Sequence, residues 1–80
     1  MPTVLRTGEY RLFFFSGEGT EPPHVHVEKG QQYAKFWLIP VSLARNHGFR
    51  SHELTAVRKL IEQNRDLIEE KWNEHFRSES

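Results

Sequence analysis

The sequence contains no cysteine, which excludes disulfide bonds and thiolate metal sites and fits a reducing compartment. It also lacks an excess of charge, because 11 Lys and Arg residues balance 11 Asp and Glu residues. This balance disfavours a protein that holds nucleic acid by bulk charge, although a local basic patch would still allow RNA binding. No apolar run approaches the roughly 20 residues that span a membrane, and the start Met1-Pro2-Thr3 does not resemble a signal peptide. We therefore expect a cytoplasmic protein with no membrane partner.

The chain is short, and its 80 residues predict a single domain over 1–80. A core of this size is marginally stable when no disulfide or metal supports it. Association would bury further surface. We therefore expect either a homodimer or a complex with a small partner protein.

Residues 22–28, which read Pro-Pro-His-Val-His-Val-Glu, hold the densest titratable chemistry in the chain. The polar and apolar residues alternate after the prolines, which is typical of a half-buried strand. The two valines should point into the core. His24, His26 and Glu28 should then share the opposite face, with alternate residues roughly 6–7 Å apart.

Three further strands are predicted from the composition of the flanking segments. Together with the His-Val-His strand, the predicted strands lie near 3–7, 10–15, 24–28 and 33–39. Gly8-Glu9 fits a type II′ hairpin turn between the first two strands. This turn places Leu5 opposite Leu12, Arg6 opposite Arg11 and Val4 opposite Phe13.

The second half of the chain has helical signals. Pro40 fits the first position of a short helix over 41–47, and Ser51 fits the cap of a long helix over roughly 51–76. Helix-spaced ion pairs are expected for Arg58–Glu62 and Arg65–Glu69. Apolar residues recur at three- and four-residue steps along the long helix. They are Leu54, Val57, Leu60, Ile61, Leu67, Ile68, Trp72 and Phe76.

These elements predict an α+β fold. A four-stranded, mostly antiparallel sheet packs against one long C-terminal helix, with a short helix before it. The sheet face under the helix should hold Leu5, Leu12, Phe14, Val25 and Val27.

Several segments carry a resemblance to a known family. They are Met1-Pro2-Thr3-Val4-Leu5-Arg6, Tyr10-Arg11-Leu12-Phe13-Phe14, residues 22–28, Ala34-Lys35-Phe36-Trp37-Leu38, and Gly48-Phe49 ahead of a helix that ends Trp72-Asn73-Glu74-His75-Phe76. Across nearly the whole chain they resemble the bacterial domain-of-unknown-function family 4160. Small proteins of this family tend to be encoded beside a second small domain. The resemblance therefore implies one half of a toxin–antitoxin-like pair, and it brings no catalytic residues with it.

The sheet face away from the helix is the candidate functional surface. Its aromatic and cationic side chains are residue types that protein interfaces favour. We predict that this face binds a second copy of the chain or a small partner protein. The candidate binding residues are Arg6, Arg11, Phe13, Phe15, Tyr33, Lys35 and Trp37, beside His24, His26 and Glu28.

Two other functions remain open at this stage, and a third is disfavoured. His24 and His26 could act as acid and base in metal-independent RNA cleavage, since histidine titrates near neutral pH. Alternatively, His24, His26 and Glu28 could bind zinc or another divalent metal. A DNA-binding helix-turn-helix is disfavoured because the second helix is long and not basic, so DNA contact is expected only indirectly, through a partner.

Overall fold

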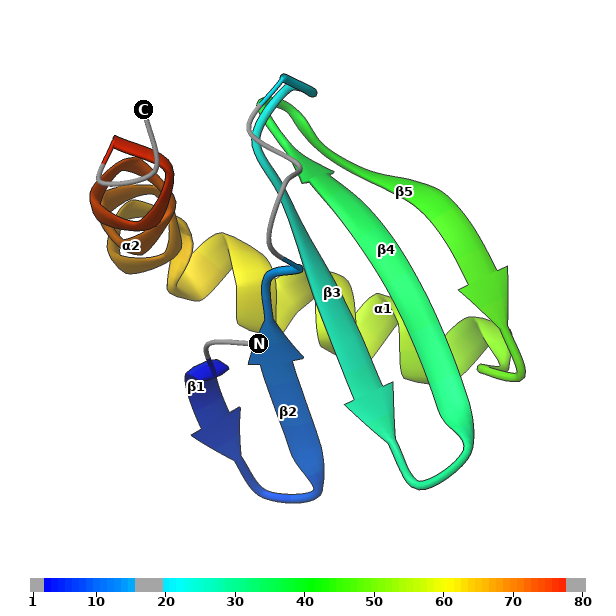
Figure 1. The fold of residues 1–80 in the computed structure, drawn as a ribbon. Coiled ribbons are helices and arrows are strands. Elements are labelled where there is room, and N and C mark those ends of the chain that lie inside the picture. Colours follow the sequence, from blue (N-terminus) through cyan, green and yellow to red (C-terminus); the bar gives the residue numbers. More distant parts are fainter. Residues whose placement is uncertain (1–2, 16–19, 78–80) are drawn as a thin grey trace.

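The computed structural model describes residues 3–15 and 20–77, which form an antiparallel sheet followed by helices (Figure 1). The strands are β1 (Thr3–Thr7), β2 (Tyr10–Phe13), β3 (His24–Lys29), β4 (Gln32–Leu38) and β5 (Val41–His47), and the helices are α1 (Ser51–Gln63) and α2 (Arg65–Arg77). The sheet order follows the chain, β1-β2-β3-β4-β5. The α+β prediction is confirmed, with a fifth strand and a divided helix as differences.

The first hairpin turns at Gly8, whose φ of 57° fits the first central position of a type II′ turn. Leu5 lies opposite Leu12 and Arg6 opposite Arg11, as predicted. The predicted pairing of Val4 with Phe13 is wrong, because Thr3 takes that place and Val4 forms a bulge.

The predicted short helix over 41–47 is also wrong, because this segment is strand β5. It pairs antiparallel with β4, from Leu38 opposite Val41 to Tyr33 opposite His47. Pro40 follows a cis peptide bond and stands between the two strands rather than at a helix start. The backbone groups along β4 find their partners in β5, and this long-range pairing outweighs the local proline signal.

The long helix is interrupted at Asn64. The Asn64 side-chain amide donates to the Leu60 carbonyl at 2.9 Å, so it competes with the backbone for a helical acceptor. The break turns Leu67 out of the predicted apolar stripe and leaves it 38% exposed. Other members of the stripe, such as Ile61 and Trp72, are buried.

Two smaller helix predictions also need correction. α1 begins at Ser51 and Arg50 is its N-cap, so the cap lies one residue earlier than predicted. The Arg65–Glu69 ion pair is present at 3.5 Å. Within residues 3–15 and 20–77, Arg58 makes no ion pair with Glu62.

The hydrophobic core lies between the sheet and the helices, with α1 crossing behind the strands in Figure 1. Four of the five predicted core positions are buried, and Leu5 is partly buried against them. The buried members of the core are Leu12, Phe14, Val25, Val27, Ala34, Phe36, Leu38, Phe49, Val57, Ile61, Ile68 and Trp72. Neither described helix is long and apolar enough to cross a membrane.

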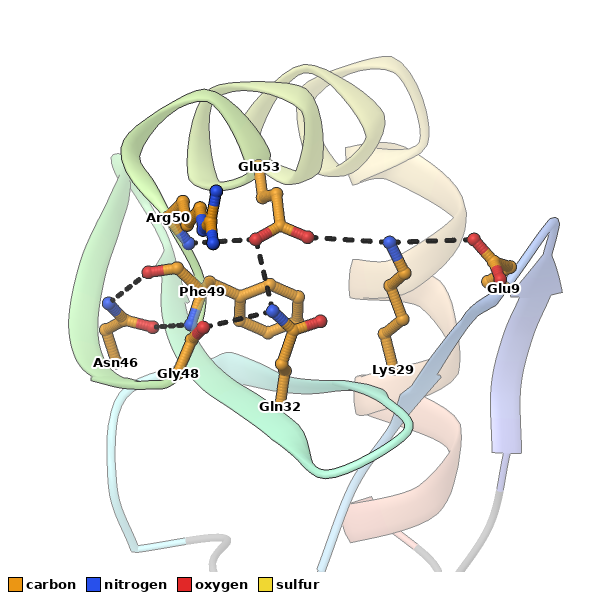
Figure 2. A network of polar contacts seen from close by, with 8 residues as sticks. All are labelled: Glu9, Lys29, Gln32, Asn46, Gly48, Phe49, Arg50 and Glu53. Carbon is orange, nitrogen blue, oxygen red and sulfur yellow. Dashed lines mark hydrogen bonds and ion pairs between the residues drawn. The ribbon is translucent and has the colours of Figure 1, made fainter.

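A polar network joins the start of α1 to the sheet (Figure 2). Glu53 accepts hydrogen bonds from the Arg50 backbone N–H at 3.0 Å and from the Gln32 amide at 3.1 Å. Its second oxygen lies 3.4 Å from the Lys29 ammonium, which also approaches Glu9 at 3.5 Å. The network therefore links α1, the β3–β4 hairpin and the β1–β2 turn.

The same network shifts two ionisation equilibria. The Arg50 N–H above all, with the Gln32 amide and the Lys29 ammonium, lowers the pKa of Glu53 below 4.5. Burial alone would lower the pKa of Lys29, but the carboxylates of Glu9 and Glu53 raise it above 10.5.

Candidate functional site

Strand pairing gathers most of the predicted site residues on one face of the sheet. Residues directly opposite one another on antiparallel strands share a face. One row runs Phe13, His26, Lys35 across β2, β3 and β4, and the next runs Arg11, Glu28, Tyr33. His24 lies opposite Trp37 in the third row. We call this surface the aromatic–cationic face, comprising Arg11, Phe13, Phe15, His24, His26, Glu28, Tyr33, Lys35 and Trp37.

The two histidines do not point into solvent. The relative exposure of His24 is 0% and that of His26 is 2%, so both imidazoles are buried on the face where the strand pattern placed them. Their rings lie 5.1 Å apart between centroids. Aromatic rings from neighbouring segments surround them, because β2 and β4 carry bulky side chains in the same rows.

His26 lies within a group of rings. Its imidazole stacks on Phe13 at 5.5 Å and meets the edge of Phe15 at 4.5 Å. His24 touches Trp37 at 5.7 Å and Trp72 of α2 at 4.9 Å. The imidazole of His24 thus connects the face to the helix layer, a contact that the strand pattern did not predict.

Both imidazoles have defined hydrogen-bond partners. The Nδ1 atom of His24 lies 2.9 Å from the Pro22 carbonyl, which can only accept, so Nδ1 carries the hydrogen. The Nδ1 atom of His26 lies 2.7 Å from the Tyr33 hydroxyl. Paired and packed in this way, both rings have fixed orientations.

The cations of the face lie over aromatic rings. The guanidinium of Arg11 is 4.5 Å from the Phe13 ring centroid and 2.9 Å from a Glu28 oxygen. The Lys35 ammonium is 4.7 Å from the Trp37 ring and 2.9 Å from Glu21. Each cation therefore combines an ion pair with a cation–π contact.

Some aromatic side chains of the face remain accessible to solvent. Phe15 is 36% exposed, while Tyr33 and Trp37 are half-buried. Arg6, which was predicted to join the face, is exposed on β1 beside Arg11 and makes no ion pair within the described residues. Its place is at the margin.

Sequence reasoning missed two residues of this surface. Arg45 lies opposite Lys35 and His47 opposite Tyr33, and both side chains are exposed. They were missed because 41–47 was assigned to a helix. The signal was available in Val41-Ser42-Leu43, whose alternation is typical of a strand.

The geometry of the face can be compared with what metal binding and RNA cleavage each require. Within residues 3–15 and 20–77, no group of three His, Cys, Asp or Glu residues is arranged to hold a metal ion. Glu28 is engaged by Arg11 instead. For RNA cleavage, two adjacent imidazoles are the right groups, but in this arrangement neither reaches a substrate without displacement of its neighbours.

The fold and this face define a small α+β protein with a packed histidine–aromatic cluster on one side of its sheet. A family model described as "Domain of unknown function (DUF4160)" matches residues 9–73. The chain belongs to this family. The search of curated proteins gave no match, and neither did the search of solved structures.

Proposed function

We propose that this chain is a protein-interaction module that binds a partner protein through the aromatic–cationic face. The observation that carries the proposal is the setting of Trp37. Its ring is half-buried between the buried imidazole of His24 and the ammonium of Lys35, so its orientation is fixed before any partner arrives. Rigid aromatic anchors flanked by cations are typical of interface residues that contribute most to affinity.

The packing of the histidines supports binding over catalysis. His24 and His26 lie buried beneath the exposed side chains of the face, and their ring contacts hold Phe15 and Trp37 in place. A preorganised surface loses less conformational entropy on association than a flexible one. The buried imidazoles therefore act as supports for the side chains that meet the partner.

The partner that we propose is a small protein encoded beside this chain, as in a toxin–antitoxin-like pair. This part rests on the family setting together with the marginal core of an 80-residue chain, which gains stability from association. A homodimer through the same face is the competing assembly.

Co-expression with each neighbouring gene product tests the proposal. Affinity capture of this chain should retain one neighbour, and light scattering of the purified product should give the mass of a complex. A homodimer in the absence of any neighbour would support the face as an interface but overturn the two-component arrangement. A stable monomer that captures no neighbour would overturn the interaction module itself.

A metal-independent ribonuclease is the second candidate, favoured by the two imidazole rings 5.1 Å apart near Lys35. It requires a bell-shaped pH dependence of RNA cleavage in the presence of a chelator, with activity lost in His24→Ala and in His26→Ala. Circular dichroism must show that each variant is folded. Absence of cleavage by the wild-type chain would exclude this candidate.

A further inference from the structure

Strand β5 leaves one edge of the sheet open. In Figure 1 no other element lies along its outer side, and the sheet order places it last, beside β4. Within the described residues, the backbone of 41–47 makes no hydrogen bond outside its pairing with β4. Residues 43–47 are all exposed. Unpaired N–H and C=O groups on such an edge can pair with an added strand.

An apolar groove runs beside this edge. It has a volume of about 250 Å³, and its lining residues are Phe36, Leu43, Leu54, Thr55 and Arg58. Leu43 is 39% exposed although it points to the helix side, opposite Phe36. Because alternate side chains of a strand point to the same face, a strand added to β5 would direct side chains into this groove. An aliphatic side chain suits its lining.

The charge of the edge indicates the composition of the added strand. β5 carries Arg45 and His47 and no acidic residue. Arg45 and Arg58 are exposed, and neither makes an ion pair within residues 3–15 and 20–77. By contrast, Lys35, which lies opposite Arg45, is paired with Glu21. The edge therefore carries uncompensated positive charge.

A bulge sets the positions of these charges. Ala44 has no partner on β4, since Leu43 pairs with Phe36 and Arg45 with Lys35. The extra residue reverses the alternation, so Leu43 stays above the groove while Arg45 joins the opposite face. A second copy of β5 would add another arginine to an edge that already has an unpaired one, which disfavours self-pairing.

We infer that β5 is a docking edge for an acidic, extended segment of a partner protein. The segment adds a strand to the sheet, places an aliphatic side chain in the groove beside Leu43, and brings carboxylates to Arg45 and Arg58. The edge adjoins the aromatic–cationic face, which Arg45 shares with Lys35, but the added strand would pair with the β5 backbone and fill the groove on the helix side of the sheet. The inference does not depend on the function proposed for that face.

A short fluorescein-labelled peptide with one central Val among Glu residues is the probe. With its Val in the groove, the Glu residues two positions away share the face of Arg58, and those next to the Val face Arg45. Fluorescence anisotropy at low ionic strength should report saturable binding to the wild-type chain. The double variant Arg45→Glu, Arg58→Glu should weaken binding about tenfold, since it turns two attractive contacts into repulsive ones. The matched control is Lys59→Glu, because Lys59 is also exposed on α1 but does not line the groove. It should bind the probe as the wild type does.

Two peptide controls separate strand addition from bulk charge. The same peptide with Lys in place of every Glu should not bind. A Glu–Val peptide N-methylated along both edges, which keeps its charge but cannot pair with a strand, should also fail. The variants Arg45→Gln and Arg58→Gln replace the charge reversals if circular dichroism shows loss of fold. Absence of probe binding, equal weakening by Lys59→Glu, or undiminished binding of the N-methylated peptide would each overturn the inference.

Discussion

The Nδ1 atom of His26 lies 2.7 Å from the hydroxyl oxygen of Tyr33, and His26 is only 2% exposed. A buried hydrogen bond of this kind contributes about 0.5–1.5 kcal/mol to stability. Tyr33→Phe should therefore lower the free energy of unfolding by about that amount in urea titrations. Tyr10→Phe is the control, since the Tyr10 hydroxyl makes no hydrogen bond within the described residues, and it should leave the midpoint nearly unchanged. Equal effects of the two changes would contradict a specific His26–Tyr33 bond.

Trp72 should be the most sensitive helix position. Its indole is 6% exposed and contacts Phe14 at 5.3 Å and His24 at 4.9 Å between ring centroids. Trp72→Ala should cost about 3–5 kcal/mol, because it leaves a cavity between α2 and the sheet. Thermal melting should show this as a large fall in Tm, whereas Asn73→Ala on the exposed side of α2 should change Tm little. A Trp72→Ala protein that melts like the wild type would show that α2 packs elsewhere.

Glu53 should make stability depend on pH in the acid range. Its pKa is lowered in the folded chain by the Arg50 N–H and by the Gln32 and Lys29 side chains, relative to 4.5. A depressed folded pKa gives stabilisation that is complete above pH 4.5 and is lost as the pH falls through the folded value. Glu53→Gln should therefore lower Tm at pH 7, and the difference from the wild type should shrink on acidification. A difference that persists unchanged at low pH would contradict the role of the carboxylate charge.

The sequence predicted which side chains of β3 share a face of the sheet, but it did not predict that the two histidines are buried. The alternation in 24–28 placed Val25 and Val27 in the core and both histidines on the opposite face, which the register confirms. Period-2 patterning says which residues share a face but not what covers that face. Phe13 and Trp37 cover the imidazoles from strands that neighbour β3 only after the sheet has formed.

The two helix errors have different origins. Pro40 is compatible with a helix start locally, yet 41–47 forms a strand because β4 offers it a long row of backbone partners. The apolar periodicity continues across Asn64 and does not indicate a break, but the side-chain amide of Asn64 donates to the Leu60 carbonyl, where α1 ends. At 41–47 the pairing with β4 outweighed a local preference, whereas at Asn64 a local side-chain bond interrupted the helix.

The central claim is that the aromatic–cationic face binds a partner protein, and the effect of Trp37→Ala on affinity tests it most directly. Calorimetric titration of the captured neighbour should give an affinity weakened by about 2 kcal/mol or more, as expected for a central aromatic anchor. Leu67→Ala is the matched control, since it removes exposed apolar surface from α2 instead, and it should bind as the wild type does. Both variants should be verified as folded by circular dichroism. An unchanged affinity for a folded Trp37→Ala protein would contradict the account.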